Sequence, residues 1–415
     1  MGRNNQHKIV VAHMGARMHY AIPVIFNQSG YLQRFYTDIY SGKFSSIRLA
    51  AKQISFTRKF SDRSSGLLSN DLIIHFPLFG LNYAYKLRKV KNAEQRLSVY
   101  TWAGKEFNRK ILKHIKWDDV ETIYGYNTAS LELFQAAKDR GVKLIYEQTI
   151  APLQVERQLL EAEEKKFPTW LTGSSIEHSS IVSEIISREQ SELELADYVV
   201  AGSDFVKRSL TSLNEEFGQK CSVIPYGVAS ANKQPAVNSD LGRRPLRLLV
   251  AGTLGLRKGT PYVLEVAKRI KGLAEIRVVG SAAMLNKQSL LQLQQHCDYR
   301  GLVPRSEMNE HYAWADVFFL PSICEGSATV TYEAMQHGLP LLVTENTGAF
   351  ITDGEEGFVV QTGDIDAMID RICQLRNDGL RTGMRKVILQ NKEKLSIEAY
   401  RHRLMKQIDV WLNDE

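Results

Sequence analysis

The stretch Leu320–Gly348, LPSICEGSATVTYEAMQHGLPLLVTENTG, decides the fold that the sequence predicts for this chain. It starts from the apolar run Val317–Leu320, which Pro321 interrupts, and it ends in a second apolar run, Leu341–Val343. Short apolar runs bounded by turn residues are typical of buried strands. The stretch therefore predicts a strand, a turn, a helix and a second strand, in that order.

Two carboxylates lie in this stretch, Glu325 in the turn and Glu333 inside the helix. Eight residues along a helix span about 12 Å, which is too far for one proton transfer but suits the two ends of a long ligand. Between them lies the helix N-terminus, whose free N–H groups and positive dipole end attract anions. The small or β-branched side chains of Ser327–Val330 let an anion approach the backbone closely. The stretch predicts a phosphate between two polyhydroxylated groups, each bound by one carboxylate.

The same residues resemble the retaining glycosyltransferases of family 4, which have the GT-B fold. The resemblance rests on E-x7-E after a Pro-Ser turn, followed by E-A-M-x-x-G-x-P, within residues 321–340. In that family the first Glu contacts the donor sugar and the second binds the ribose hydroxyls, which implies these roles for Glu325 and Glu333. The backbone amides that hold the diphosphate would come from Gly326, Ser327, Ala328 and Thr329. The alternative is a generic buried β-α-β unit with two capping glutamates.

A second motif, TLGLRKG at residues 253–259, precedes a predicted helix. Its family counterpart is G-R-L-x-x-x-K-G, in which Arg and Lys neutralise the donor diphosphate and so stabilise the charge that builds up on the leaving group. Lys258 and Gly259 match this pattern. Thr253 stands where the family has Arg, and Arg257 is the candidate for the missing charge. For Lys258 the alternative is an exposed helix-start residue, although a cation there opposes the helix dipole.

We therefore predict three catalytic residues, Glu325, Lys258 and Arg257, with Glu325 as an anchor for the donor sugar and not as a nucleophile. Four further residues are predicted to bind the donor: Gly255, Gly280, Arg300 and Leu302. Residues 299–303, YRGLV, resemble the segment that holds the nucleobase through backbone groups. The helix that follows is expected to have Ser306 as its N-cap.

The first half of the chain begins with an apolar run, Lys8–His13, a Gly-containing turn and a helical pattern. This predicts a Rossmann-like unit, without a G-x-G-x-x-G fingerprint. GT-B transferases have this first loop near the cleft, usually with Gly-Gly where this chain has Gly15-Ala16. Many family members also have a cleft-facing His after the strand that corresponds to Lys143–Gln148. We predict five residues on the acceptor side of the cleft: Gly15, Arg17, His19, Gln148 and Thr149. For the first three, loop structure and helix capping are the alternative.

The polar stretch Ala229–Pro245 is the best linker in the chain. Residues 224–228, IPYGV, resemble the family's hinge motif I-P-x-G-V. The predicted fold is α/β GT-B, with two Rossmann-like domains facing across a cleft and a C-terminal helix crossing back to the first domain. The expected units are a Rossmann-like acceptor domain at 1–228, a linker at 229–245, a Rossmann-like nucleotide-sugar domain at 246–395 and the returning helix at 396–415.

A chain of 415 residues with 44% hydrophobic and 24% charged residues is expected to form about two globular domains. Its four cysteines lie far apart without metal-ligand spacing, which is typical of reduced thiols in the cytoplasm. The sequence has no apolar run long enough for a membrane span, and its N-terminal run is too short for a signal peptide. The D-x-D string Asp364–Asp366 lies at the start of a predicted helix, and neither a metal ion nor a cofactor is expected.

Positive charge is concentrated in residues 34–116, where 17 Lys and Arg face 5 Asp and Glu, a net +12 in a chain whose total is +7. Apolar and aromatic residues are interleaved with these cations. Such a surface suits an anionic acceptor or an anionic membrane, with the protein peripheral on the inner face of the cytoplasmic membrane. A solvated basic face without a partner is the equal alternative. No nucleic-acid-binding motif is present.

The resemblance implies a retaining, metal-independent transfer of a sugar from a nucleotide-diphosphate sugar to a hydroxyl of a glycan or glycolipid, in cell-surface polysaccharide or lipid-linked oligosaccharide synthesis. UDP is favoured over GDP as the nucleotide. The lack of a close carboxylate pair argues against double displacement, and the resemblance implies front-side attack assisted by the leaving phosphate. Two alternatives stay open: a catalytically inactive nucleotide-sugar-binding GT-B protein and a GT-B sugar-nucleotide epimerase. The sequence identifies neither the sugar nor the acceptor.

Overall fold

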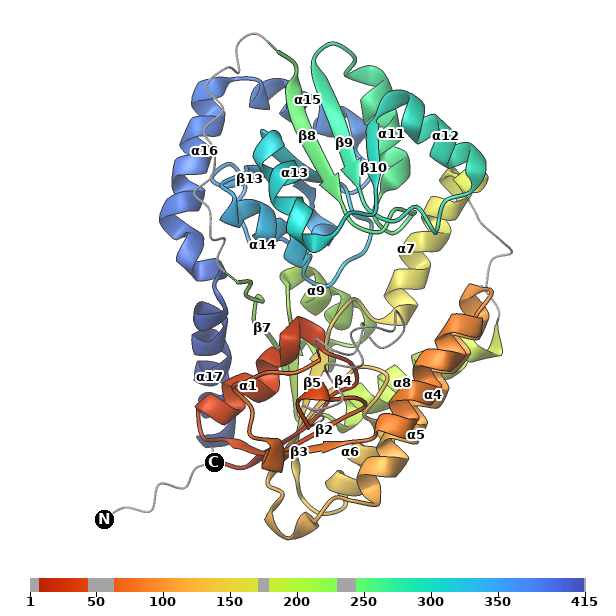
Figure 1. Ribbon diagram of the computed structural model, residues 1–415, viewed down its shortest axis with the longest axis vertical. Coiled ribbons are helices and arrows are strands. Elements are labelled where there is room, and N and C mark those ends of the chain that lie inside the picture. The colour runs from red at the N-terminus through yellow and green to blue at the C-terminus, as the bar shows by residue number, and fades with distance from the viewer. Residues whose placement is uncertain (1–6, 44–62, 171–178, 230–243, 414–415) are drawn as a thin grey trace.

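The computed structural model describes residues 7–43, 63–170, 179–229 and 244–413. Two parallel sheets form the two halves of the molecule, one above the other in Figure 1. The first sheet has seven strands in the order β3-β2-β1-β4-β5-β6-β7, and the second has six in the order β10-β9-β8-β11-β12-β13. Helices connect most successive strands in each sheet. The prediction of two Rossmann-like domains is confirmed.

Strands of the first sheet are short and mostly buried, because the crossover helices cover both faces of a parallel sheet. These strands are β1 (Ile9–Ala12), β2 (Leu32–Thr37), β3 (Ile73–His75), β4 (Thr122–Tyr126), β5 (Lys143–Gln148), β6 (Tyr198–Ala201) and β7 (Cys221–Val223). The α-helices of this half are α1 (Ala21–Gln28), α4 (Pro77–Lys89), α5 (Ala93–Leu112), α6 (Leu131–Lys138), α7 (Leu153–Lys166), α8 (Ser180–Leu195), α9 (Asp204–Leu213) and α10 (Glu215–Gln219). Their apolar faces form the buried core on the two sides of the sheet.

The second sheet contains the strand–turn–helix–strand unit that the opening stretch predicts, as β11, α14 and β12. Its strands are β8 (Leu246–Ala251), β9 (Ala274–Val279), β10 (Asp298–Gly301), β11 (Val317–Leu320), β12 (Leu341–Thr344) and β13 (Gly357–Val360). The helices of this half are α11 (Thr260–Arg269), α12 (Lys287–His296), α13 (Met308–Trp314), α14 (Thr329–Gln336), α15 (Ile365–Leu375), α16 (Asp378–Asn391) and α17 (Ile397–Asn413). β11 and β12 pair in parallel, with Phe319 opposite Leu342.

The helix predicted to start at Ser306 begins later. Arg305–Glu307 form a 3-10 turn, and α13 starts at Met308. The N–H of Glu307 bonds to the carbonyl of Pro304 at 3.0 Å, which closes this turn ahead of the helix. The prediction that Ser306 is the N-cap is therefore wrong.

Two helices join the domains in addition to the linker. α17 returns to the first sheet, where Tyr400 and Leu404 are fully buried in the same core as β1. α7 follows β5 but extends to the second domain, as Figure 1 shows. There Glu163 accepts a hydrogen bond from the Tyr262 hydroxyl of α11 at 2.6 Å, and Leu160 packs against the second core. Packed helices thus set the relative placement of the two sheets.

None of the helices in the described ranges combines the length and apolar character that crossing a bilayer requires. Of the basic region predicted to face an anionic surface, residues 44–62 lie outside the described residues. The described part of that region includes β2, β3, α4 and α5.

Candidate functional site

The candidate site lies where loops leave the carboxyl ends of the strands, the edge at which open α/β sheets bind ligands. On the second sheet, the loop after β8 carries Arg257 and Lys258, and the loop after β11 carries Glu325. Glu325 is only 8% exposed. Its Oε1 lies 2.8 Å from Lys258 Nζ and 3.0 Å from Arg257 Nη1. The structure brings together the three residues predicted to be catalytic.

Arg257 fixes its loop against the loop that carries Glu325. The carbonyl of Arg257 accepts a hydrogen bond from Ile323 N at 2.8 Å, and its Nη1 donates to the carbonyl of Cys324 at 3.3 Å. Thr253, which occupies the position of the family's Arg, is exposed and carries no charge. Arg257 is therefore placed to supply the second cation at Glu325.

The turn after β8 requires a glycine directly after Lys258, and Gly259 provides it. Its φ is +66°, and a Cβ there would lie 1.8 Å from the carbonyl oxygen of Pro321. Only glycine adopts this conformation without a side-chain clash. The close approach of the two loops holds Lys258 at Glu325.

The N-terminus of α14 presents backbone N–H groups beside Glu325. Among the described residues, no acceptor is found for the N–H groups of Gly326, Ser327 and Thr329. Ala328 N reaches only the carbonyl of Thr347, at 3.4 Å. An anion at this helix end would be held by these donors and by the helix dipole.

Glu333 lies further along α14 and makes contacts that the sequence did not predict. Its Oε2 accepts a hydrogen bond from the Tyr312 hydroxyl at 3.0 Å, and its Oε1 accepts one from Arg305 Nη2 at 3.2 Å. Arg305 Nη1 also lies 3.1 Å from His19 Nε2 of the first domain. Arg305 is 286 residues from His19, and no motif marks it. The structure therefore links a predicted acceptor-side residue to the predicted ribose carboxylate.

The loop that carries His19 has an unusual backbone. Met18, His19 and Tyr20 have φ values of +48°, +53° and +65° in succession. Each L-residue in this left-handed region costs about 1–2 kcal/mol. Such strain persists only where the surrounding structure holds it, and it gathers at functional sites.

Arg17 lies just before this turn and reaches two further residues that sequence reasoning missed as site residues. Arg17 Nη2 donates to the Tyr226 hydroxyl at 2.8 Å, and Arg17 Nε lies 3.6 Å from Oε1 of Glu147. Glu147 is the last residue but one of β5, directly before Gln148, and it is 1% exposed. The only available signals were a lone acidic residue near the end of a buried strand and the aromatic residue in the hinge motif.

Gly15 and His13 follow β1 in the same loop. Gly15 N donates to Asp38 Oδ1, after β2, at 2.9 Å. His13 stacks on Tyr126 with ring centroids 4.4 Å apart. Burial, together with the charge of Arg17, lowers the pKa of His13 to about 3. This imidazole is therefore neutral in the working pH range.

Gln148 and Thr149 differ in their surroundings. Gln148 is fully buried, and its Nε2 donates to the carbonyl of Ile150 at 2.9 Å and to Glu189 at 3.3 Å, inside the first domain. Thr149 meets the second domain, because a Cβ on Gly326 would lie 1.9 Å from its carbonyl oxygen. Of the two, Thr149 is the one that approaches Gly326, in the loop that carries Glu325.

The remaining predicted donor residues lie around β8, β9 and β10. Gly255 N donates to Thr260 Oγ1 at 2.9 Å, and Gly280 N donates to the carbonyl of Gly301 at 2.8 Å. Arg300 forms an ion pair with Asp298 at 2.7 Å, and Leu302 is 80% exposed. The charge of Arg300 is thus engaged on its own strand and not at either of the two glutamates.

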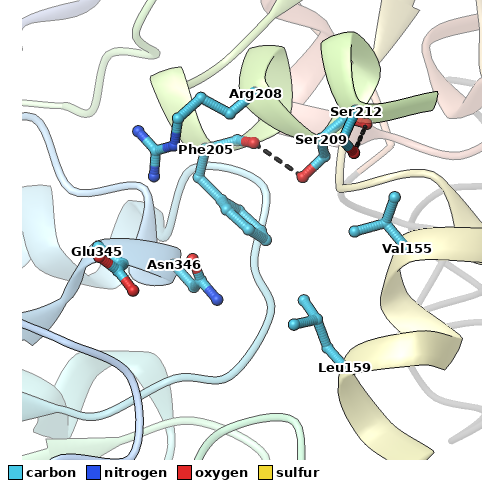
Figure 2. A pocket seen from close by; sticks show the side chains of 8 residues that line it. All are labelled: Val155, Leu159, Phe205, Arg208, Ser209, Ser212, Glu345 and Asn346. Carbon is cyan, nitrogen blue, oxygen red and sulfur yellow. Dashed lines mark hydrogen bonds between the residues drawn. The ribbon is translucent and has the colours of Figure 1, made fainter. Parts of the chain in front are cut away.

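A hollow of about 530 Å³ lies beside the site, between α7, α9 and the turn after β12 (Figure 2). Phe205 and Leu159 line it together with Arg208 and Asn346. None of the predicted catalytic or donor-binding residues is among its lining residues. The candidate site is therefore defined by its carboxylates, cations and amides, and not by this hollow.

Within the described part of the chain, no group of three or more His, Cys, Asp or Glu side chains has the arrangement of a metal site.

Sequence comparisons find relatives that are named glycosyltransferases. Residues 245–378 match the family model described as glycosyl transferases group 1. The UDP-Gal:alpha-D-GlcNAc-diphosphoundecaprenol alpha-1,3-galactosyltransferase of Escherichia coli is 29% identical over 179 residues, 38% of this chain and 46% of that protein. The capsular polysaccharide biosynthesis glycosyltransferase CapM of Staphylococcus aureus is 28% identical over 198 residues, 43% of this chain and 52% of that protein. The chain thus matches about half the length of these relatives.

Structural comparison covers nearly the whole chain. HepE of Anabaena, in complex with UDP and glucose, matches 97% of this chain and 99% of its own, with a TM-score of 0.59 and 13% identity. This likeness shows the fold: the two parallel-sheet domains are arranged as in GT-B glycosyltransferases.

Proposed function

We propose that this protein is a retaining, metal-independent glycosyltransferase of family 4, which moves a sugar from a nucleotide-diphosphate sugar to a hydroxyl of a glycan or glycolipid. UDP is the nucleotide proposed first. Lys258 and Arg257 would stabilise the leaving diphosphate, Glu325 would anchor the donor sugar, and Glu333 would bind the ribose. Cell-surface polysaccharide or lipid-linked oligosaccharide synthesis is supported by relatives named for a diphosphoundecaprenol acceptor and for capsule synthesis.

The observation that carries this proposal is the convergence of Lys258 and Arg257 on one oxygen of Glu325, beside the free amides of α14. Two cations on one carboxylate leave positive charge available for the phosphate oxygens of a donor. Because charge builds up on the diphosphate as the glycosidic bond breaks, fixed cations and amides at this point lower the barrier. A carboxylate engaged by two cations suits an anchor better than a nucleophile. In the retaining route, the leaving phosphate would take the proton of the acceptor hydroxyl.

Purified protein incubated with UDP-, GDP- and ADP-sugars is expected to hydrolyse one donor slowly and to melt at a higher temperature with it, since ligand binding stabilises the folded state. Glu325→Ala is expected to abolish both effects, and Lys258→Ala is expected to slow the hydrolysis by about 10²–10³-fold. The matched control is Glu398→Ala, which removes an exposed carboxylate that pairs with Arg401 on α17. Parallel reactions with EDTA and with Mg²⁺ test metal independence.

Other outcomes of this panel would favour the alternatives. Donor binding without hydrolysis, and without transfer to any membrane extract, would indicate an inactive nucleotide-sugar-binding protein. Release of an isomerised nucleotide sugar, detected by chromatography, would indicate an epimerase. Loss of activity in EDTA would contradict a metal-independent reaction.

We also propose that α4 docks this protein on an anionic membrane, where a lipid-linked acceptor would be found. Three apolar side chains of α4 are exposed, Leu78 at 83%, Leu81 at 40% and Tyr85 at 53%, and Lys89 Nζ lies 4.5 Å from the centroid of the Tyr85 ring. The last turn of the helix adds Lys86 and Lys89. An exposed apolar stripe with adjacent cations suits the interface of an anionic bilayer.

Binding to vesicles of phosphatidylglycerol and phosphatidylcholine is expected to weaken as salt increases, because cations contribute to it. The double variant Leu78→Glu, Tyr85→Glu is expected to bind at least about tenfold more weakly, since it removes two apolar contacts and adds negative charge. Leu291→Glu, at a 51% exposed leucine on α12, is the control. Absence of vesicle binding, or binding that salt does not change, would contradict this docking surface.

A further inference from the structure

A buried carboxylate lies at the carboxyl end of β5, under the loop that carries Arg17. Glu147 Oε2 accepts a hydrogen bond from the Tyr124 hydroxyl at 2.6 Å, and its Oε1 accepts one from the Tyr226 hydroxyl at 2.8 Å. Tyr124 and Tyr226 are fully buried. Burying a carboxylate destabilises the folded state unless the carboxylate is hydrogen-bonded and close to a cation. Arg17 is the cation that the structure places beside it.

Arg17 is held in position without using up its hydrogen-bonding capacity. Its guanidinium lies 5.0 Å from the centroid of the Tyr226 ring, and Nη2 donates to the hydroxyl of the same residue. Arg17 Nε is a buried atom without a hydrogen-bond partner among the described residues, whereas the side chain as a whole is 35% exposed. Burial opposes the charge, but Tyr226 and Glu147 outweigh it, so the pKa of Arg17 is raised. With five N–H donors on a guanidinium, several stay available for a ligand.

The contacts of Arg17 with Tyr226 and Glu147 fix the residue that directly precedes the strained turn at residues 18–20. His19, in that turn, reaches across to Arg305, which in turn contacts Glu333. The hinge motif at residues 224–228 is also held in place, because Arg403 of α17 donates to the carbonyl of Tyr226 at 3.3 Å. A change at Glu147 or Tyr226 would therefore move the first-domain loop relative to the donor site.

We propose that Arg17 binds a phosphate oxygen of a substrate and that Glu147 and Tyr226 are its positioning residues. This inference rests on the proposed function, because it places the cation in the cleft of a sugar transferase. A planar guanidinium matches a phosphate in geometry and charge. The phosphate belongs either to the donor diphosphate or to a phosphorylated acceptor, and two measurements separate these sources.

Tyr226→Phe tests the positioning role because it removes only the hydroxyl between Arg17 and Glu147. We expect kcat/KM to fall about tenfold, since a hydrogen bond to a charged group is lost. Tyr146→Phe is the matched control, because Tyr146 is also fully buried and donates to a different buried carboxylate, Glu192, at 3.0 Å. Its kinetic constants are expected to stay within about twofold of the parent, because the lost bond lies outside the cleft.

Arg17→Lys is expected to lose at least as much activity as Tyr226→Phe, because a lysine cannot reproduce the fork-shaped contact. The donor arm measures the affinity of each variant for UDP by calorimetry. The acceptor arm measures the dependence of transfer on the concentration of a membrane lipid extract, with donor saturating. Weaker UDP binding assigns Arg17 to the donor diphosphate, whereas a raised KM for the extract with unchanged UDP affinity assigns it to an acceptor phosphate.

Equal kinetic effects of Tyr226→Phe and Tyr146→Phe, or an Arg17→Lys variant with parental constants, would overturn the inference while leaving the proposed function intact. A parent protein that binds no nucleotide sugar would instead remove the proposed function itself. Melting temperatures of the variants check that the comparison is made between folded proteins.

Discussion

Lys258→Ala is expected to slow sugar transfer by about 10²–10³-fold, the loss typical when a fixed donor to a developing anion is removed. Lys258 Nζ lies 2.8 Å from Glu325, and the lysine side chain is only 13% exposed. Arg257 would still contact Glu325, which keeps this buried carboxylate paired. The loss should therefore appear in the rate far more than in the melting temperature.

Rates of donor hydrolysis and of transfer, measured at saturating donor, check this prediction. Lys268→Ala is the matched control, because Lys268 is an exposed residue of α11 that pairs with Glu265. Arg257→Ala, measured in parallel, tests whether Arg257 supplies the charge that Thr253 lacks. If Lys258→Ala keeps more than about a tenth of the parental rate, this lysine does not stabilise the leaving group.

Gly326→Ala is expected to prevent the two domains from meeting, with a loss of transfer of about 100-fold, because misplacement of about 1 Å in an active site can cost that much. A Cβ on Gly326 would lie 1.9 Å from the Thr149 oxygen and 2.9 Å from its carbonyl carbon. Both atoms belong to the backbone and cannot rotate away. The Ser203 hydroxyl, which bonds to the carbonyl of Gly326, would be displaced as well.

Transfer rate, donor affinity and small-angle X-ray scattering together test this effect. The variant should show a more open shape and weaker donor binding than the parent. Gly383→Ala is the control, because a Cβ at this position in α16 has no heavy atom within 4 Å. Parental activity in Gly326→Ala would show that the contact between Thr149 and Gly326 is not part of the working conformation.

Local sequence signals were sufficient for most of the fold. The apolar runs on either side of Glu325 and Glu333 predicted β11, α14 and β12, because a buried strand and a helix each leave their own period in the sequence. Ser306 was misassigned because a 3-10 turn and the first turn of a helix have similar residue preferences, and only the hydrogen bond from Glu307 to Pro304 separates them.

The residues proposed to bind the donor could also be recognised in the sequence, since they lie in two compact motifs. Glu325, Lys258 and Arg257 were predicted from spacing and resemblance. The structure places Lys258 Nζ and Arg257 Nη1 each within 3.0 Å of Glu325 Oε1. Gly259 illustrates why such motifs can be recognised in a sequence. Its φ is positive and its backbone lies close to Pro321, so only glycine fits at this position. A local geometric requirement of this kind restricts the residue type at one position, and that restriction can be seen in the sequence.

By itself, then, the sequence determined the two-domain α/β architecture and the loops that carry Lys258 and Glu325, because periodicity and tight turns are local properties of the chain. Only the tertiary structure decided that His19 meets Arg305 and that Arg17 lies between Tyr226 and Glu147. These partners are separated by more than 100 residues, and no local pattern encodes which loops will face each other. The packing of α7 and α17 between the domains sets that relation.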